Sequence, residues 1–327
     1  MRIVATLPAR RASPVAALRA AFLSALVVAV PAAAAPFAYI TNQGSNDVSV
    51  IDLATDRVVA TVAVGKSPAG VAVASAIGRA FVSDPDSRDV SVIDLAPPHP
   101  VTRIDAGSGP VGIAVAPDGR RLYVADWYAN RLLAYDTKDD RQLAAIEVGS
   151  APAGIVVSPD ATTVYVAARD DDAVTEVDAV TLAVRGRIHV GEHPFALGLT
   201  RDGTRLFALN VVSNDVTIVD TATRETKATL GVGLAPYGVA FSADGRRAYV
   251  TNQHGASLTV IDVGAARVEA TWPSCDYPEG IAVHADRVYV VSWMEDAVCI
   301  YDAASGARRG RVDVGSNPRG FGAFLTE

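Results

Sequence analysis

Residues 249–262 read YVTNQHGASLTVID, and residues 39–52 read YITNQGSNDVSVID. In both stretches an aromatic residue opens a short apolar run, and an Asp thirteen residues later closes a second run. The unit occurs seven times, with spacings of 42, 42, 42, 42, 42 and 40 residues, and a fixed period of this kind indicates a repeat architecture. The aromatic positions are Tyr39, Phe81, Tyr123, Tyr165, Phe207, Tyr249 and Tyr289, and the closing acids are Asp52, Asp94, Asp136, Asp178, Asp220, Asp262 and Asp302.

Each repeat predicts four short strands. They are an apolar run after a Pro (GVAVA, 70–74), the aromatic strand (AYVTN, 248–252), an alternating strand (DVSVID, 47–52) and a longer strand that ends at Gly (VVATVAVG, 58–65). The connections contain PDG, ADG or Asn-rich stretches, which favour tight hairpins. Four strands in about 40–45 residues match one propeller blade. The sequence therefore predicts an all-β, seven-bladed β-propeller with four-stranded antiparallel blades.

The strand after each Pro is rich in small residues, as expected for the innermost strand of a blade, where the strands converge. The chain begins with an aromatic strand, residues 37–42, and ends with a strand of the type that follows Pro, residues 319–325. We expect the two to share one blade, because their pairing closes the ring and removes the exposed edges of an open array. Residues 35–327 are thus predicted to form one domain.

Residues 1–34 have a different composition from the rest. Four Arg and no acidic residue accompany the apolar run AAFLSALVVAV (20–30), and small residues follow it, with Ala32 and Ala34 before a processing site. This order is typical of a secretory signal peptide, and a retained N-terminal anchor is the alternative. We expect a periplasmic or secreted protein with no stable membrane insertion after cleavage, since no second long apolar run exists.

Composition and charge exclude several classes of protein. With 50% hydrophobic residues, 26 Gly and 2 Cys, the chain is neither disordered nor collagen-like nor a disulfide-dense mini-domain. Removing residues 1–34 changes the net charge from -7 to -11, because it leaves 25 basic against 36 acidic residues. An acidic chain without a basic stripe argues against nucleic acid as a partner.

The motifs Tyr39-Ile40-Thr41-Asn42 and Tyr249-Val250-Thr251-Asn252, followed by VSVID and LTVID, resemble the repeats of YVTN-family β-propellers, also described as YncE-like proteins. The resemblance covers all seven units and implies a propeller fold and export. Similar proteins include some encoded beside quinone-dependent alcohol oxidation systems, surface-layer proteins and one described as binding single-stranded DNA. The central units depart from the motif, with YVAA at 165–168 and FALN at 207–210, so the resemblance does not name a ligand.

Differences between the copies mark a candidate ligand site, because the fold itself requires only what is repeated. The loops from the aromatic strand to the third strand, and from Gly to Pro, are expected to lie on one face, which we call the funnel face. The residue after each Pro then rings the channel mouth. Three are small or aliphatic, and the next four are predicted to bind a ligand: Phe195, Tyr237, Glu279 and Arg319.

Five further residues are predicted at the rim of the same face: Trp127, Trp293, Arg169, His193 and His254. Aromatic residues with a few directed polar groups are typical of a recognition surface. The alternative is a structural role, in which Phe195 and Tyr237 plug the channel, Glu279 and Arg319 neutralise one another, and the Trp residues cover blade edges.

Two classes of function follow. The first is a non-enzymatic, exported binding or scaffolding protein for a small molecule, peptide or exported partner protein, monomeric and without a cofactor. The alternative is an exported lyase or lactonase. No residue is assigned a catalytic role, because no nucleophile elbow or helical His pair is present, although His193 and His254 would serve as metal ligands or an acid/base pair if they met. Asp170–Asp172 would bind a hard cation or, as charge runs usually do, remain solvated.

The chain has two thiols, and both lie outside the leader. Cys275 takes the slot of the Gly that ends the outer strand in other repeats, and Cys299 takes a slot held by Ser49, Thr217 and Thr259. Both slots lie near the funnel face. In an oxidising compartment a disulfide between them is predicted, with two unpaired, half-buried thiols as the alternative.

Overall fold

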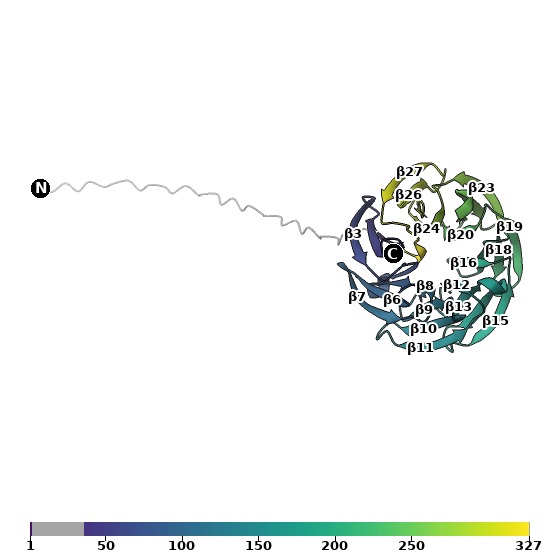
Figure 1. Ribbon diagram of the computed structural model, residues 1–327. Coiled ribbons are helices and arrows are strands. Elements are labelled where there is room, and N and C mark those ends of the chain that lie inside the picture. Colours follow the sequence, from purple (N-terminus) through teal and green to yellow (C-terminus); the bar gives the residue numbers. More distant parts are fainter. Residues whose placement is uncertain (2–35, 327) are drawn as a thin grey trace. The chain divides into compact units, whose positions relative to one another are not determined.

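The computed structural model describes residue 1 and residues 36–326, so nearly all of the predicted signal peptide lies outside the described residues. Residues 36–326 form seven β-sheets around a common axis, which confirms the seven-bladed propeller (Figure 1). Three short 3₁₀ helices lie in loops, and no helix in the described part is long and apolar enough to cross a membrane. They are η1 (Ser75–Ile77), η2 (Arg169–Asp171) and η3 (Gln253–Gly255).

The innermost strands approach one another closely, and glycine makes this possible. A Cβ atom at Gly112 would lie 1.8 Å from the carbonyl oxygen of Ala153 in the next blade, and a Cβ atom at Gly280 would lie 2.2 Å from that of Gly320. Any side chain there would force the blades apart. The inner strands are β4 (Gly70–Ala74), β8 (Pro110–Val115), β12 (Pro152–Val157), β16 (Pro194–Leu199), β20 (Pro236–Phe241), β24 (Pro278–His284) and β28 (Phe321–Ala323).

The second strand of each blade carries the repeated aromatic residue, which is buried in all seven copies. The core lies between neighbouring blades: Phe207, for example, packs in one cluster with Val250 of the following blade. Burying seven large rings between blades stabilises the stacking of each sheet on the next. The second strands are β1 (Phe37–Asn42), β5 (Arg79–Asp84), β9 (Arg121–Asp126), β13 (Thr163–Ala168), β17 (Arg205–Asn210), β21 (Arg247–Asn252) and β25 (Arg287–Ser292).

The third strand was predicted from its alternating pattern, which is typical of a half-buried strand. Its four central residues are instead almost all buried, because neighbouring blades cover both faces of each sheet. Its small polar residues, such as Ser49 and Thr217, are therefore buried too. The third strands are β2 (Asp47–Asp52), β6 (Asp89–Leu95), β10 (Arg131–Asp136), β14 (Ala173–Asp178), β18 (Asp215–Asp220), β22 (Ser257–Asp262) and β26 (Ala297–Asp302).

The outer strands are mostly exposed at the rim of the ring. In every blade the pairing of the third and outer strands slips near one end, for example between Val50 and Ile51. The outer strands are β3 (Arg57–Ala63), β7 (Pro98–Asp105), β11 (Gln142–Glu147), β15 (Val184–His189), β19 (Thr226–Gly231), β23 (Arg267–Pro273) and β27 (Arg308–Asp313).

The two ends of the propeller share one blade, as predicted. Arg319 N–H donates to Thr41 O at 2.9 Å, and Tyr39 N–H donates to Phe324 O at 2.8 Å. Between these contacts β28 leaves β1 and pairs in parallel with β4 of the next blade. Gly320 and Gly322, with φ of 60° and 113°, provide the left-handed conformations of this detour. It carries the C-terminal segment across the inside of the ring (Figure 1).

Candidate functional site

The four residues after Pro meet at the mouth of the channel. Three of them are the second residue of an inner strand: Phe195 in β16, Tyr237 in β20 and Glu279 in β24. Arg319 lies two residues before β28. The Phe195 and Tyr237 ring centroids are 4.8 Å apart, and Arg319 Nε lies 3.5 Å from Glu279 Oε2. The structure thus joins two aromatic rings and an ion pair.

Phe321 is a fifth member that the sequence-based prediction missed. Its ring centroid lies 5.0 Å from that of Phe195 and 5.8 Å from that of Tyr237, so three rings close the mouth of the channel. Phe195 and Tyr237 therefore help to plug the channel, as the structural alternative proposes. A comparison of the third residue after each Pro gives the clue, because the other repeats have Val, Ile or Leu at this position.

The polar part of the site is buried and incompletely paired. Glu279 is 0% and Tyr237 6% exposed, whereas the Arg319 side chain is 25% exposed. Gln253 Nε2 donates to Glu279 Oε1 at 2.7 Å. Tyr237 OH, Glu279 Oε2 and Arg319 Nε have no hydrogen-bond partner among the described residues. Unpaired buried polar atoms are costly, and native proteins keep few of them.

Burial controls the charge of this cluster. It raises the pKa of the Glu279 carboxyl to about 7, and the nearby Arg319 charge and the Gln253 and Tyr237 side chains limit the rise. Burial also raises the pKa of Tyr237, so its hydroxyl stays protonated. Around neutral pH the cluster therefore offers a guanidinium, a hydroxyl and a carboxyl that gains or loses its proton.

Two groups of rim residues extend the site. The Arg169 guanidinium carbon lies 5.7 Å from the centroid of the Trp127 ring, and Trp127 lies 6.1 Å from Phe195, so this group continues the aromatic cluster. In the second group Tyr277 lies between two predicted residues. Its hydroxyl is 3.2 Å from His254 Nε2, and its ring centroid is 5.4 Å from that of Trp293.

Tyr277 and Gln253 were also missed by the sequence-based prediction. Tyr277 immediately precedes Pro278, a position that His193 holds in another repeat, so a comparison of that slot would have identified it. Gln253 has a counterpart, Gln43, in the first repeat, and its role arises only from its contact with Glu279.

His193 stands apart from the other predicted residues. Its backbone N–H donates to Asp172 Oδ1 at 2.9 Å, and its Nδ1 is buried without a hydrogen-bond partner. In the described part of the chain, no hydrogen bond or ring contact joins His193 to His254. The acid/base or metal pair of these two residues therefore has no contact to support it.

The acidic run of η2 is engaged by protein groups. Asp170 pairs with Arg169, and Asp171 pairs with Arg187 at 2.8 Å. Asp172 accepts the His193 N–H at 2.9 Å. Each of the three carboxylates therefore has a protein partner, and its position is explained by a structural role that needs no bound cation.

The predicted disulfide is not formed in the structure, which describes Cys275 and Cys299 as free, buried thiols. The fold nevertheless brings the two sulfur atoms within 4.8 Å of one another and of a Glu295 oxygen. Each thiol also has another neighbour: Ser274 Oγ lies 3.7 Å from Cys275 Sγ, and Arg308 Nη2 donates to Cys299 Sγ at 3.4 Å.

Two surface hollows lie away from the funnel face, at the hairpin turns of the opposite face. One is lined by residues around Arg79 and Thr137, and the other by residues around Arg247 and Glu269. None of the predicted site residues lines either hollow. Within the funnel cluster, Arg319 is the most accessible polar group.

Comparison with protein families supports the propeller assignment. Residues 156–251 match a family model described as YNCE-like beta-propeller, and residues 32–175 match a model described as Lactonase, 7-bladed beta-propeller. Each model covers less than half of the chain. Together they confirm the resemblance to YncE-like propellers. No curated protein matches the chain.

Several solved structures are similar to this chain. Hydrazine synthase of Kuenenia stuttgartiensis is 22% identical with a TM-score of 0.74, over 81% of this chain and 92% of that chain. A functionally unknown protein from Desulfotomaculum acetoxidans is 16% identical with a TM-score of 0.76, over 88% and 99%. Dihydro-heme d1 dehydrogenase NirN, in complex with DHE, is 16% identical with a TM-score of 0.66, over 88% and 74%. At these identities the likeness shows the fold alone.

Proposed function

On the premise that the chain is a YncE-like β-propeller protein, we propose that it is an exported, non-enzymatic binding or scaffolding protein. It recognises a small molecule, peptide or partner protein through an anionic group bound at the funnel face. Cleavage after residue 34 releases it into the periplasm or the medium. The signal-peptide composition of residues 1–34 supports export.

The state of Arg319 carries this proposal. Its side chain is three-quarters buried, and its buried Nε has no hydrogen-bond partner. The guanidinium donates no hydrogen bond to any described residue, and its charged neighbour is Glu279 at 3.5 Å. A partly buried guanidinium without protein acceptors loses part of the hydrogen bonding that it has in water. A carboxylate or phosphate group would replace them, because the planar fork of Arg forms two parallel bonds with such anions.

The surroundings of Arg319 suit a ligand with an anionic end and an apolar body. Tyr237 OH is a second unpaired polar group beside it, and Phe195 and Phe321 supply ring surface. The Arg169–Trp127 pair extends that surface to the rim. Rings provide contact area and a few fixed polar groups provide orientation, as in most ligand sites.

Retention of molecules from an extract of the export compartment tests the proposal. The immobilised protein, its Arg319→Ala and Tyr237→Ala variants and an Arg246→Ala control are incubated with the same extract, and retained molecules are identified by mass spectrometry. Arg246 is the matched control, since its side chain is 86% exposed and its ion partner is Asp244 on the opposite face. We expect an anionic species on the wild type and the control that is lost from the other two.

Equal retention by all four proteins would contradict the assignment of the site to Arg319. Melting curves of each variant are measured in parallel, so that loss of binding is separated from loss of folding. An Arg319→Lys variant keeps the charge without the fork, and we expect it to bind more weakly than the wild type.

A second candidate function is that of an exported lyase or lactonase. The match of residues 32–175 to the seven-bladed lactonase model favours it, and the His254–Tyr277 hydrogen bond places a titratable group on the rim. Turnover of a panel of lactones by the wild type that falls at least tenfold in His254→Ala would support this candidate. Absence of turnover, or full activity in both His193→Ala and His254→Ala, would reject it.

A further inference from the structure

Cys275 occupies a position that is glycine in every other repeat. A Cβ atom at Gly233 or Gly315 would lie 2.6 Å from the side chain of Asn252 or Asn42. In the last complete blade this Asn is replaced by Ser292, whose shorter side chain leaves room for the thiol. The two exchanges are therefore coupled.

A third exchange in the same blade adds the second thiol. In three repeats the Asn side chain donates to a Ser or Thr on the third strand, as Asn252 Nδ2 does to Thr259 Oγ1 at 3.0 Å. In this blade the equivalent of Thr259 is Cys299. An Asn–Thr–Gly network that stabilises the fold elsewhere has thus become Ser–Cys–Cys. Because other blades fold with Asn, Thr and Gly at these three positions, the requirements of the fold do not explain the two Cys residues.

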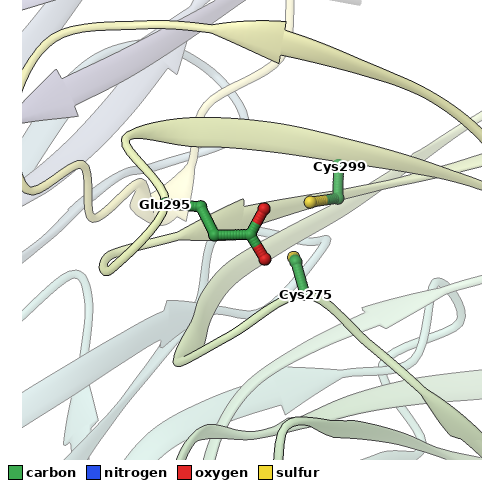
Figure 2. A group of neighbouring side chains, drawn as sticks. All are labelled: Cys275, Glu295 and Cys299. Atoms are coloured by element: carbon green, nitrogen blue, oxygen red, sulfur yellow. The ribbon is translucent and has the colours of Figure 1, made fainter.

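Glu295 completes the cluster. Three of the other repeats have a Ser at its slot, and the Ser hydroxyl accepts a backbone N–H, as Ser87 Oγ accepts that of Lys66. Glu295 keeps this task, because Oε1 accepts the Asp276 N–H at 2.9 Å. Its longer side chain also brings a carboxylate oxygen to within 4.8 Å of both sulfur atoms (Figure 2).

Two guanidinium groups balance the charge of these ligands. Arg308 Nη2 donates to Cys299 Sγ at 3.4 Å, and Arg311 Nη1 donates to Glu295 Oε2 at 3.0 Å. Two thiolates, one carboxylate and a divalent cation carry a total charge of -1, which these two cations more than offset. N–H donors beyond the ligands also fix the ligand orientation, as is usual at metal sites.

We propose that Cys275, Cys299 and Glu295 form a Zn²⁺ site with water as the fourth ligand. The mixed donor set favours zinc, which accepts thiolate and carboxylate together, whereas calcium and magnesium require oxygen ligands. In a tetrahedral zinc site thiolate sulfurs lie about 3.8 Å apart, since each Zn–S bond is about 2.3 Å. The two sulfur atoms lie within 4.8 Å of one another, so small side-chain movements would bring them to the distance that zinc requires. Glu295, with its side chain 25% exposed, is the most accessible of the three residues.

Metal binding to the full chain tests the site. The protein is purified reduced, the reductant is removed anaerobically, and Zn²⁺ is measured after equilibrium dialysis, with Co²⁺ as a spectroscopic probe. We expect one Zn²⁺ per chain and a thiolate-to-cobalt charge-transfer absorption. Cys275→Gly and Cys299→Ser introduce residues that other repeats carry at these slots, so both variants are expected to fold. Each should lose the absorption and at least 100-fold in zinc affinity.

Glu295→Gln should retain the absorption and lose about tenfold in zinc affinity. The matched control is Glu225→Gln, whose side chain is 72% exposed, and it should bind like the wild type. Less than one zinc per chain, or unchanged zinc binding in both Cys variants, would overturn the site. So would the absence of free thiols in denatured, unreduced protein from the export compartment, because a disulfide would then occupy both sulfur atoms.

Discussion

Asp84 occupies a slot that Asn holds in three of the repeats. Asn42 Nδ2 donates to Asp47 Oδ1 at 2.6 Å and to Ser49 Oγ at 2.9 Å. At the equivalent place Asp84 has no N–H to donate, and its Oδ1 and that of Asp89 are both buried without a partner. Burial, aided by the Asp89 charge, raises the pKa of Asp84 to about 7 despite the opposing Ser91 hydrogen bond.

We therefore predict that Asp84→Asn stabilises the protein. The new amide can donate to Asp89 and Ser91, as Asn42 does to its neighbours, for a gain of about 1–2 kcal/mol at pH 8. The gain should shrink at pH 4. Because the native pKa of Asp84 is raised, its contribution to the wild type is favourable below its unfolded value near 4 and is lost as the pH rises to 7. Urea unfolding at both pH values checks this, and destabilisation at pH 8 would contradict it.

Glu279 should make ligand binding depend on pH. It faces Arg319, Tyr237 and Gln253, and its pKa is raised to about 7 by burial. Below that pH it is neutral, and the Arg319 charge is available to an anion; above it the carboxylate competes. We expect a carboxylate ligand to bind several-fold more tightly at pH 6 than at pH 8, and Glu279→Gln to bind tightly at both. Titration calorimetry measures the slopes, and equal slopes in the two proteins would be the contrary result.

Copy-to-copy differences predicted Phe195, Tyr237, Glu279 and Arg319, because these positions are equivalent in every repeat. Tyr277 and Phe321 would have been found by comparing two further positions of the repeat, the residue before each Pro and the third residue after it. Gln253 could not be found in this way, since its importance depends on a contact between blades. The unpaired state of Arg319 was also beyond prediction, because it depends on side-chain geometry.

Glycine in the inner strands allows neighbouring blades to pack closely against one another. Gly112→Ala would place a Cβ 1.8 Å from the Ala153 carbonyl oxygen of the neighbouring blade, whereas nothing lies within 4 Å of a Cβ at Gly231. We predict that Gly112→Ala destabilises the protein by about 2–3 kcal/mol and that Gly231→Ala changes it by less than about 0.5 kcal/mol. Chemical denaturation of both variants checks the contrast, and similar values would show that the inner strands are loosely packed.

Strand order and blade number were predictable because every repeat repeats the same signals. Burial of the third strand was not, since its alternating sequence is typical of a strand with one exposed face. In a propeller both faces of each sheet meet other blades. The small polar residues of this strand therefore pair with polar residues of the second strand instead of with water, as Thr217 does with Asn210. The alternation of polar and apolar residues in the third strand therefore reflects its hydrogen bonds and does not indicate which residues are exposed to solvent.

Ring closure depends on a few residues at the C-terminus. Phe321 and Phe324 are buried, and the backbone of residues 318–326 pairs with β1 and β4. Deleting the chain from Pro318 onward removes both rings and exposes the edges of two blades. We predict a loss of at least about 3 kcal/mol from the two rings alone, and increased aggregation at the open edges. A truncated chain that melts like the full-length protein would disprove the closure.

At the scale of the whole molecule, the proposed function depends on the partly buried Arg319 guanidinium, which has no hydrogen-bond acceptor among the described residues. The most direct measurement is the dissociation constant of the retained anionic molecule for the wild type, Arg319→Ala and Arg246→Ala. We predict a loss of well over tenfold in Arg319→Ala and no change in Arg246→Ala, because only the first removes a charge-assisted contact at the funnel face. An unchanged dissociation constant in Arg319→Ala would contradict the account and place binding elsewhere on the molecule.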